Sequence, residues 1–317
     1  MRTAQWTTVN GRRRASAAGR LTKSFLLCAA LVALLVGCVP ATSQSAVPVW
    51  DTGVNPDAWA QIPAGTFHFG QHDDMVTIEA PYEMMVTNVT NAQYARYLNA
   101  ALAKGTVKID GDNVVGYYPG DTFHGHKHEV EITPGDWLHV PLNDPSLRLT
   151  FDGAAFGVKP GYENHPMTVV TWFGAQAYCE FYGGRLPSEA EWERAARGDD
   201  DRPFPWGAGI ALNNANFYAS RDPFEATAGK QGDTTPVGFY SGQSYGDYQT
   251  LDSASPYGLY DMAGNVWQWV SDLTEGIHDR TLKGGSKGEY DYNLRIWARN
   301  AARPDYVSPS VGFRCAR

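Results

Sequence analysis

The chain has 317 residues, a formal net charge of −8 at pH 7 and a pI near 5.5. An acidic balance of this size does not provide the basic surface that nucleic acids require, so no nucleic-acid partner is expected. Ten tryptophans and 33 glycines, with only 19% charged residues, favour a compact, loop-rich fold over a helical bundle.

The N-terminal segment is typical of an exported protein. Basic residues between Arg12 and Lys23 precede an apolar run from Phe25 to Val36. A run of that length suits a signal sequence and is too short for the ~20 residues of a membrane-spanning helix. We therefore expect residues 1–37 to be a signal peptide that is removed.

The signal segment ends in Leu35-Val-Gly-Cys38, which resembles a bacterial lipobox. The resemblance implies lipidation of Cys38, with residues 38–49, rich in Pro, Ala and Ser, as a tether to the lipid anchor. The chain is then a periplasm-facing lipoprotein of the bacterial cell envelope. No Asp follows Cys38, which favours the outer membrane. The alternative is an ordinary cleaved signal with a chance cysteine.

Residues 50–317 have a length that fits one domain. Ile62–Gly70 alternates apolar and polar residues around glycines, which predicts a strand and a hairpin. Asn88–Leu98 predicts a helix, because Thr90 and Gln93 have the spacing of a capping box. The buried face of this helix is expected to include Val89, Ala92, Tyr94 and Leu98.

Residues 105–160 are the least regular part of the sequence and predict loops with short strands. Asn164–Trp172 is expected to run into a strand, and Phe173–Tyr182 to form a helix that ends at Gly183. From Phe204 onward, short strands joined by Gly, Asn, Asp and Pro turns are expected.

The clearest helix start lies within Arg185–Arg197. Ser188 is the expected N-cap, Glu191 completes a capping box, and Gly198 ends the helix. The residues expected to face inward are Ala190, Trp192, Ala195 and Ala196.

Of the four cysteines, Cys28 leaves with the signal and Cys38 takes the lipid. Cys179 and Cys315 remain as an even pair in an oxidising compartment, for which a disulfide is the default. Such a bond closes a loop of 136 residues. The chain-entropy model gives this roughly 4–5 kcal/mol. The rival interpretation is a redox-active or metal-binding pair, although no second thiol or histidine sits beside either cysteine.

Nine short motifs occur in order along residues 60–317. They are Ile62-Pro-Ala-Gly, Val86-Thr-Asn-Val-Thr-Asn-Ala-Gln-Tyr94, His165-Pro, Val170-Thr-Trp172, Arg185-Leu-Pro-Ser-Glu-Ala-Glu-Trp192, Pro205-Trp-Gly207, Tyr257-Gly-Leu-Tyr-Asp-Met-Ala-Gly-Asn-Val-Trp267, Gly284-Gly-Ser286 and Gly312-Phe-Arg-Cys315. Together they resemble the formylglycine-generating-enzyme (sulfatase-modifying factor) family. The resemblance implies an α+β fold related to C-type lectins, with short strands, few helices and much irregular structure. It also implies that Cys179 and Cys315 are disulfide partners.

The chemistry of that family depends on two cysteines after the Gly-Gly-Ser motif, which hold copper(I). Here the segment Lys287–Trp297 contains no cysteine: the first thiol position falls on Glu289, and the second on Leu294 or Arg295. Because copper(I) seeks soft thiolate ligands, we expect no copper(I) site and no formation of formylglycine.

Three functions remain open. The first is an oxidoreductase-like maturation role in the periplasm, similar to that of thiol-less pyoverdine-maturation relatives. Glu289 would then act as a general acid or base beside Ser286 and Trp269. Arg299 and Arg303 would hold an anionic substrate group, unless they form salt bridges to the Glu189–Glu193 helix.

The second function is a non-catalytic binding module with a small-molecule or envelope-protein partner. Retroelement display proteins share the lectin-like scaffold and vary in this C-terminal segment. Tyr290, Asp291, Tyr292 and Asn293 are residue types that binding loops use, since tyrosine gives a large contact area at low entropic cost. The third function is a structural lipoprotein of the envelope.

The resemblance also implies bound calcium. One site would use the Asn216 side chain, the Phe217 carbonyl and an acidic residue of the loop Gly229–Thr234, for which Asp233 is the candidate.

A second calcium site would use backbone carbonyls of Gly264 and Val266 with the side chain of Gln268, where the family has Glu. Calcium prefers charged oxygen ligands, so this replacement weakens the site. The alternative is that Asn265 and Gln268 only satisfy turn amides.

His124, His126 and His128 alternate with other residues, so they would share one face of a strand and offer imidazoles to zinc, copper or nickel. Glu129 would then point to the other face. The alternative is an exposed polar loop that binds metal only adventitiously.

Overall fold

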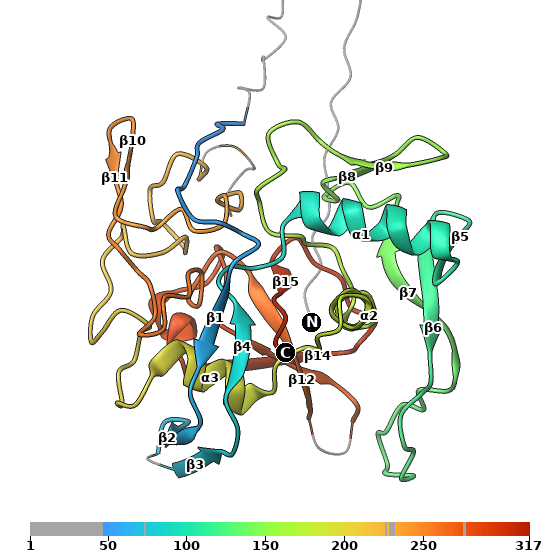
Figure 1. Cartoon of the computed structure of the whole chain (residues 1–317), viewed down its shortest axis with the longest axis horizontal. Helices are drawn as coiled ribbons and strands as arrows, with labels where there is room; N and C mark the ends of the chain where they lie inside the picture. The colour runs from blue at the N-terminus through green and yellow to red at the C-terminus, as the bar shows by residue number, and fades with distance from the viewer. Residues whose placement is uncertain (1–46, 73, 226, 228–231, 275–276) are drawn as a thin grey trace, which may run out of the picture. The chain divides into compact units, whose positions relative to one another are not determined.

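The structure is a computed structural model that describes residues 47–72, 74–225, 227, 232–274 and 277–317 (Figure 1). The signal segment, Cys38 and most of the tether lie outside these residues. Within the described part of the chain, no helix is both long enough and apolar enough to cross a membrane. The elements below belong to one compact unit, Ser45–Arg317.

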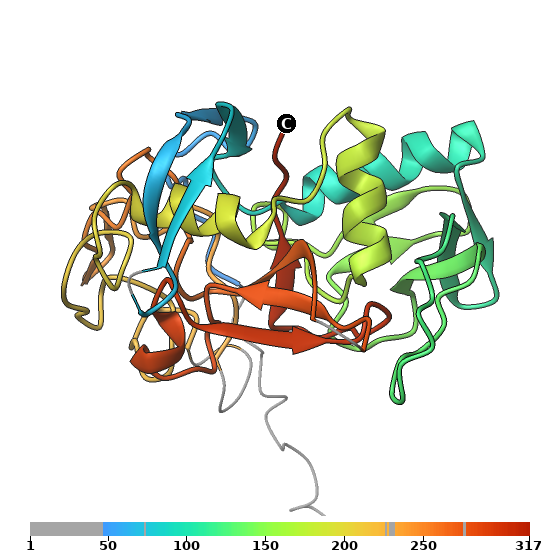
Figure 2. The same ribbon diagram turned by 90° about the horizontal axis from the view of Figure 1, so that it is seen from below.

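A four-stranded sheet of order β14-β13-β12-β15 organises the C-terminal half. Its strands are β12 (Trp267–Leu273), β13 (Arg280–Lys283), β14 (Arg299–Ala302) and β15 (Val311–Phe313). β12 runs antiparallel to β13 and parallel to β15, so that Trp267 lies opposite Val311 and Trp269 opposite Phe313. In Figure 2, α2 (Trp172–Phe181) and α3 (Glu189–Arg197) lie on the same side of these orange and red strands.

The remaining strands are short and antiparallel. They are β1 (Trp59–Ile62) with β4 (Tyr82–Met85), the hairpin β2 (Gly65–Phe69) with β3 (Asp74–Ile78), β5 (Val107–Asp110) with β6 (Asn113–Tyr118) and β7 (Gly135–Pro141), β8 (Leu149–Phe151) with β9 (Phe156–Val158), and β10 (Ser244–Tyr245) with β11 (Tyr248–Gln249). The architecture is therefore α+β with few helices and short strands. The hairpin after Ile62 is confirmed, and region 105–160 is more regular than expected because β5, β6 and β7 form a sheet.

The helices begin where their capping residues predict. α1 (Asn91–Lys104) has Thr90 as its N-cap, with Gln93 completing the box. It runs past the expected end at Leu98 by about 1.7 turns before Gly105 ends it in a left-handed conformation. α3 has the same box from Ser188 and Glu191. Because each box satisfies two amides that a helix start leaves without partners, the local sequence alone decides these boundaries.

The inward face of α3 carries charge as well as apolar side chains. Trp192, Ala195 and Ala196 are buried as expected, whereas Ala190 is only half-buried. Glu189 and Glu193 are also buried, and both bind the ammonium of Lys283 on β13, at 3.2 and 3.1 Å. These ion pairs fix α3 against the sheet.

The strand expected over Asn164–Trp172 is absent from the structure. Its backbone amides bond to three separate segments instead: Met167 to Val89, Val169 to Ser308 and Thr171 to His139. Val169 has a positive φ of 58°, which breaks the extended conformation. The segment is a buried connection that joins α1, β7 and the loop before β15.

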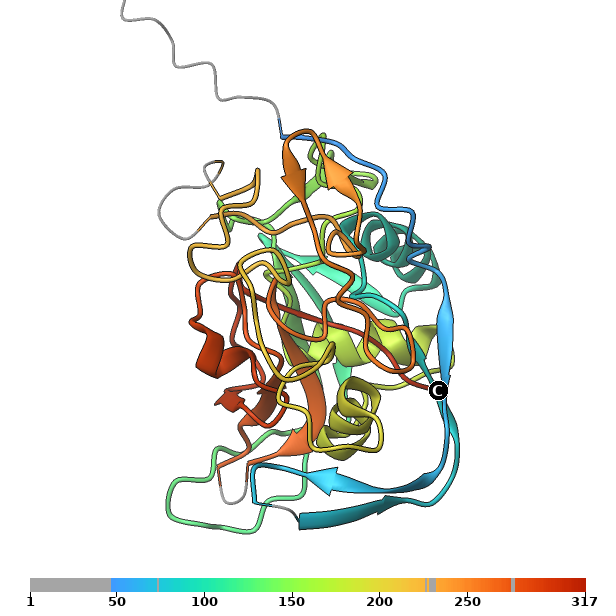
Figure 3. The same ribbon diagram turned by 90° about the vertical axis from the view of Figure 1, so that its left-hand side faces the viewer.

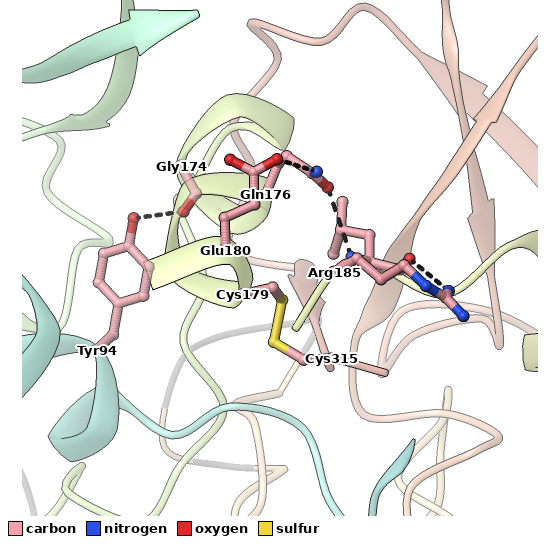
Figure 4. Close-up of a disulfide and its surroundings, with 8 residues drawn as sticks. Tyr94, Gly174, Gln176, Cys179, Glu180, Arg185 and Cys315 are labelled. Atoms are coloured by element: carbon pink, nitrogen blue, oxygen red, sulfur yellow. Dashed lines mark hydrogen bonds between the residues drawn. A yellow bond between two sulfur atoms is a disulfide. The ribbon is translucent and has the colours of Figure 1, made fainter. Parts of the chain in front are cut away.

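The main core lies between α1, α2 and the sheet, and the disulfide crosses it. Cys179 on α2 is bonded to Cys315 just after β15, with Cα atoms 5.6 Å apart (Figure 4), which confirms the expected disulfide. Beside it, the rings of Tyr94 and Tyr178 stack at 5.6 Å, and Phe313 packs edge-on against both. The bond therefore ties the last strand to the helical side of the core.

Candidate functional site

A cleft opens at the start of β12 and β15, with a volume of about 480 Å³. Its lining residues come from β12, β13, β14, the segment after Gly285 and the loop before β15. They are Trp267, Leu282, Ser286, Gly288, Glu289, Asn300, Ala301, Ala302, Tyr306, Ser308, Pro309, Ser310 and Val311. Glu289 is the one carboxylate among these described residues, and neither a cysteine nor a basic side chain is among them. The described lining of the cleft is thus polar and free of thiols, with Glu289 as its one charged side chain, while the ammonium of the neighbouring Lys287 donates to Ser310 Oγ at 2.9 Å.

Two neutral donors from different elements hold the carboxylate of Glu289. The indole Nε1 of Trp267 donates to Oε1 at 3.2 Å, and the amide Nδ2 of Asn293 donates to Oε2 at 2.6 Å. The backbone of Glu289 is also fixed, since its amide donates to the Ser286 carbonyl and its own carbonyl accepts from Tyr218. The side chain is half-buried and its orientation is set by these contacts.

Of the two residues expected beside Glu289, the structure places only Ser286 in the cleft. Trp269 is fully buried, and its indole donates to the Val170 carbonyl at 3.2 Å. Trp267 lies beside Glu289 instead, in the position that was expected for Trp269. Both indoles follow the two-residue alternation of β12, but only Trp267 lies at the strand start where the cleft opens.

The tyrosines that follow Glu289 are exposed. The side chains of Tyr290 and Tyr292 are 64% and 56% exposed, and Tyr290 packs against Tyr218 with ring centroids 4.8 Å apart. Tyr290 is the N-cap of the short 3₁₀ turn η2 (Asp291–Leu294), and Tyr292 lies within it. Asn293, expected to bind ligand, instead holds Glu289. Neither tyrosine lines the cleft, and both have exposed surface available for contacts with a partner.

The arginines proposed to hold an anion do not line the cleft. Arg299 lies 3.6 Å from Glu189 of α3, which is the alternative given for it above. Arg303 pairs instead with Asp305 at 3.0 Å. Each guanidinium therefore faces a carboxylate of this chain.

The second calcium site does not fit the residues present. The Oε1 atom of Gln268 accepts from the Trp192 indole at 2.9 Å and from the Arg314 guanidinium at 2.7 Å. Burial lowers the pKa of Arg314 to about 9, an effect that Asp261 opposes, so the group remains a cation at neutral pH. A guanidinium on the oxygen that calcium would need repels the ion. Gln268 therefore holds Trp192 and Arg314 in place. It is not available as a calcium ligand alongside the carbonyls of Gly264 and Val266.

The first calcium site stays a prediction. Asn216 and Phe217 line a small cavity together with Glu225, and Lys287 also borders it. Asp233, the suggested acidic ligand, is held by Arg148 at 3.1 Å and by the Tyr162 hydroxyl at 2.6 Å. Residues 229–231 of the candidate loop lie outside the described residues.

The histidines of the segment 124–128 lie in a loop between β6 and β7, not on a strand as expected. His124, His126 and Glu129 bring one ligand atom each to within 4.8 Å of one another, and His128 is not part of the group. Glu129 thus shares a side with the histidines, because the loop turns back and the backbone amides of His124 and His126 donate to its carboxylate.

His278, which no sequence motif singles out, completes this cluster. His278 contacts Glu129 Oε1 through Nε2 at 2.6 Å and Asp121 Oδ2 through Nδ1 at 2.9 Å. Arg280 binds the same Asp121 oxygen at 2.7 Å. Burial raises the pKa of Glu129, but the hydrogen bonds from the backbone of His124 and from His278 outweigh it and lower the pKa to about 2. The carboxylate is therefore ionised at any physiological pH.

Comparison with known proteins decides the family. The family model described as "Sulfatase-modifying factor enzyme 1-like domain" matches residues 47–317. The chain belongs to this family. It is 32% identical over 294 residues to the mouse (Mus musculus) "Formylglycine-generating enzyme", a match that covers 80% of this chain and 73% of the relative.

Two further matches are a related sequence and a solved structure. The mouse protein named "Inactive C-alpha-formylglycine-generating enzyme 2" is 35% identical over 172 residues, which cover 52% of each chain. The solved structure of PvdO from Pseudomonas aeruginosa superposes with a TM-score of 0.52 at 23% identity, covering 86% of this chain and 98% of that one. The second match supports the fold alone.

Proposed function

We propose that this family member recognises a ligand with a cationic group in the cleft, and that it does not form formylglycine. The observation that carries the proposal is the position of Glu289, the single charged side chain among the described residues that line the cleft. No thiol lines it either, so neither copper(I) ligation nor exchange with a substrate cysteine has a group to perform it.

The carboxylate has acceptor capacity left after its contacts within the protein. An ionised carboxylate offers about four lone-pair positions, and Trp267 and Asn293 use one on each oxygen. A ligand ammonium or guanidinium can occupy the others through charge-assisted hydrogen bonds, which are stronger than neutral ones. The two neutral donors keep the carboxylate oriented, so little side-chain entropy is lost on binding.

The walls of the cleft suit the rest of such a ligand. The Tyr306 and Trp267 side chains offer aromatic surface, which attracts cations and packs against apolar groups. Asn300, Ser308 and Ser310 add hydrogen-bonding groups. Tyr290 and Tyr292, which follow Glu289 in the chain and are exposed, offer further contact surface to a partner that is a small molecule or a protein side chain.

The same proposal includes the cellular setting. A lipid on Cys38 would hold the domain at the bacterial envelope, facing the periplasm, where its partner is a small molecule or an envelope protein. The oxidoreductase hypothesis uses Glu289 as a general acid or base. We place binding first because both carboxylate oxygens already serve as fixed acceptors.

Tyramine is a suitable probe, since it joins an ammonium group to an aromatic ring. We expect it to bind the purified protein with a dissociation constant on the order of millimolar, as befits a small fragment. Its analogue 4-hydroxyphenylacetate, with a carboxylate in place of the ammonium, should not bind. Both are measured by ligand-observed NMR and by isothermal titration.

Glu289→Gln should weaken tyramine binding by about tenfold, because it replaces a charge-assisted bond with a neutral one. Glu79→Gln is the matched control, an exposed carboxylate elsewhere on the surface that should leave binding unchanged. Equal binding of both probes, or no difference between the two variants, would contradict the proposal.

A further inference from the structure

The cluster of His124, His126 and Glu129 lies outside the motifs that mark the family and outside the cleft. The loop that carries it, between β6 and β7, lies near the start of β13 (Figure 3), and His278 just before that strand contacts Glu129. The imidazole of His124 is 61% exposed, whereas the Glu129 carboxylate is 1% exposed. The cluster therefore combines one fixed, buried acceptor with two accessible imidazoles.

The distances come close to those of a metal site. The three candidate ligand atoms lie within 4.8 Å of one another, and His124 Nδ1 is 3.3 Å from Glu129 Oε1. Ligand atoms around a tetrahedral zinc are about 3.3 Å apart, given Zn–N distances near 2.05 Å. The rings of His124 and His126 already stack at 5.8 Å, so small rotations of exposed side chains bring all three atoms into range.

A second layer of residues fixes the carboxylate. His278 bonds to Glu129, Asp121 to His278, and Arg280 to Asp121. This series of hydrogen bonds begins at Glu129 on the loop and ends at Arg280 on β13 of the four-stranded sheet. Its first bond already joins residues that are 149 positions apart in sequence. Ligands of protein metal sites are commonly held by such outer hydrogen bonds, which set their orientation. An adventitious pair of surface histidines does not require this layer.

We propose that His124, His126 and Glu129 bind a divalent transition-metal ion, with zinc as the ion that the donor set fits best. Two imidazoles and a carboxylate form a borderline-soft set that suits zinc, and water completes the coordination. His278 acts as a positioning residue through Glu129. His128, assigned to this site from the sequence, is not a ligand.

The site has a structural link to the cleft, although the proposal does not depend on the function of the cleft. Arg280, the last member of the outer layer, is paired across β13 and β14 with Ala302, which lines the cleft. A bound ion would therefore stabilise the loop against the same sheet that carries the cleft. Coordination positions filled by water leave the ion open to an exogenous ligand.

The test is isothermal titration of zinc chloride into the mature protein, purified without a histidine tag and stripped with a chelator. We expect one zinc per chain. His126→Ala should weaken binding at least tenfold, and His278→Gln by 10- to 100-fold, the range typical of second-layer changes. His128→Ala is the matched control in the same loop and should bind zinc like the unmodified protein.

Stability supplies an independent readout, because a ligand that binds only the folded state raises the melting temperature. Zinc should raise it for the unmodified protein and for His128→Ala, and not for His126→Ala. The melting temperatures of the stripped proteins show whether each variant folds. The absence of stoichiometric binding, or equal losses in His126→Ala and His128→Ala, would overturn the proposal in favour of an adventitious ion only.

Discussion

The two ends of the strand pair β12–β15 differ in whether their charged side chains have all their hydrogen-bonding capacity used within the protein. At the far end of β15, Cys315 is bonded to Cys179, and Arg314 donates to Gln268 and to four backbone carbonyls. At the start of the pair, Glu289 accepts two side-chain hydrogen bonds and faces a cleft. The first end is a closed frame, whereas the second retains capacity to bind. The contacts that stabilise the fold and the residues proposed to bind ligand thus lie at opposite ends of one pair of strands.

The largest effect is expected from Arg314→Met. The change removes a fully buried cation and leaves carbonyls of Met85, Val86, Tyr260 and Asp261 without that donor. Loss of one partner from a buried charged network costs about 3–5 kcal/mol. We expect that loss in the free energy of unfolding in urea. Arg317→Met, an exposed arginine with Glu83 as its ion-pair partner, should cost under about 1 kcal/mol.

The disulfide tests the same end of the strand pair. Cys315→Ser should lower the free energy of unfolding by about 2–5 kcal/mol, because the unfolded chain regains the freedom of a long loop. A reductant should shift the urea midpoint of the unmodified protein toward that of the variant and leave the variant unchanged. A midpoint indifferent to reductant would show that the bond does not stabilise the domain.

Acid should destabilise the whole domain through two buried histidines, His139 on β7 and His165. Burial lowers the pKa of His139 and of His165 to about 4, against about 6.5 in an unfolded chain. Between these values the unfolded state binds protons that the native state does not. Stability is therefore fully present above about pH 6.5, falls as the pH drops toward 4, and receives no further change from these groups below that.

At about 1.4 kcal/mol per pKa unit, the two shifts set an upper limit of about 7 kcal/mol on the acid effect of both histidines together. It is measured as urea midpoints at several pH values between 7 and 4. His139→Gln should flatten the profile, since it removes one of the two titrating groups. A profile with the same slope in the variant would assign acid sensitivity to other groups.

The smallest effect on stability is expected at the open end of the pair. Glu289→Gln keeps the shape of the side chain and an oxygen that accepts from Trp267, so the free energy of unfolding should change by under about 1 kcal/mol. Together with the expected loss of tyramine binding, this separates the two ends. A loss above about 2 kcal/mol would show that Glu289 belongs to the frame.

Local sequence predicted those features that depend on local contacts. Thr90 with Gln93 and Ser188 with Glu191 make capping boxes within four residues, so the starts of α1 and α3 followed directly. The disulfide could be predicted because the expected loss of Cys28 and lipidation of Cys38 leave only Cys179 and Cys315 to pair. The prediction of a strand before Trp172 was wrong, because the amides of this segment bond to three segments that are distant in sequence. No local pattern encodes such contacts.

The candidate site was predictable only in part. Family position selected Glu289 and Ser286, but the partners of Glu289 depend on how β12 and the η2 turn meet. Trp269 was expected beside Glu289, whereas Trp267 contacts it, because the sequence does not show at which end of β12 the cleft opens. His278 lies 149 residues from Glu129, so only the folded chain relates them.

The most direct test of the account is an assay for formylglycine. The purified protein is incubated with a sulfatase-type cysteine peptide, copper(I) and oxygen, and the peptide is then examined by mass spectrometry beside an active relative as control. We predict full conversion by the relative and none by this protein, because none of the described residues that line its cleft is a cysteine. Detection of the formylglycine peptide with this protein would contradict the central claim that its cleft binds ligand without thiol chemistry.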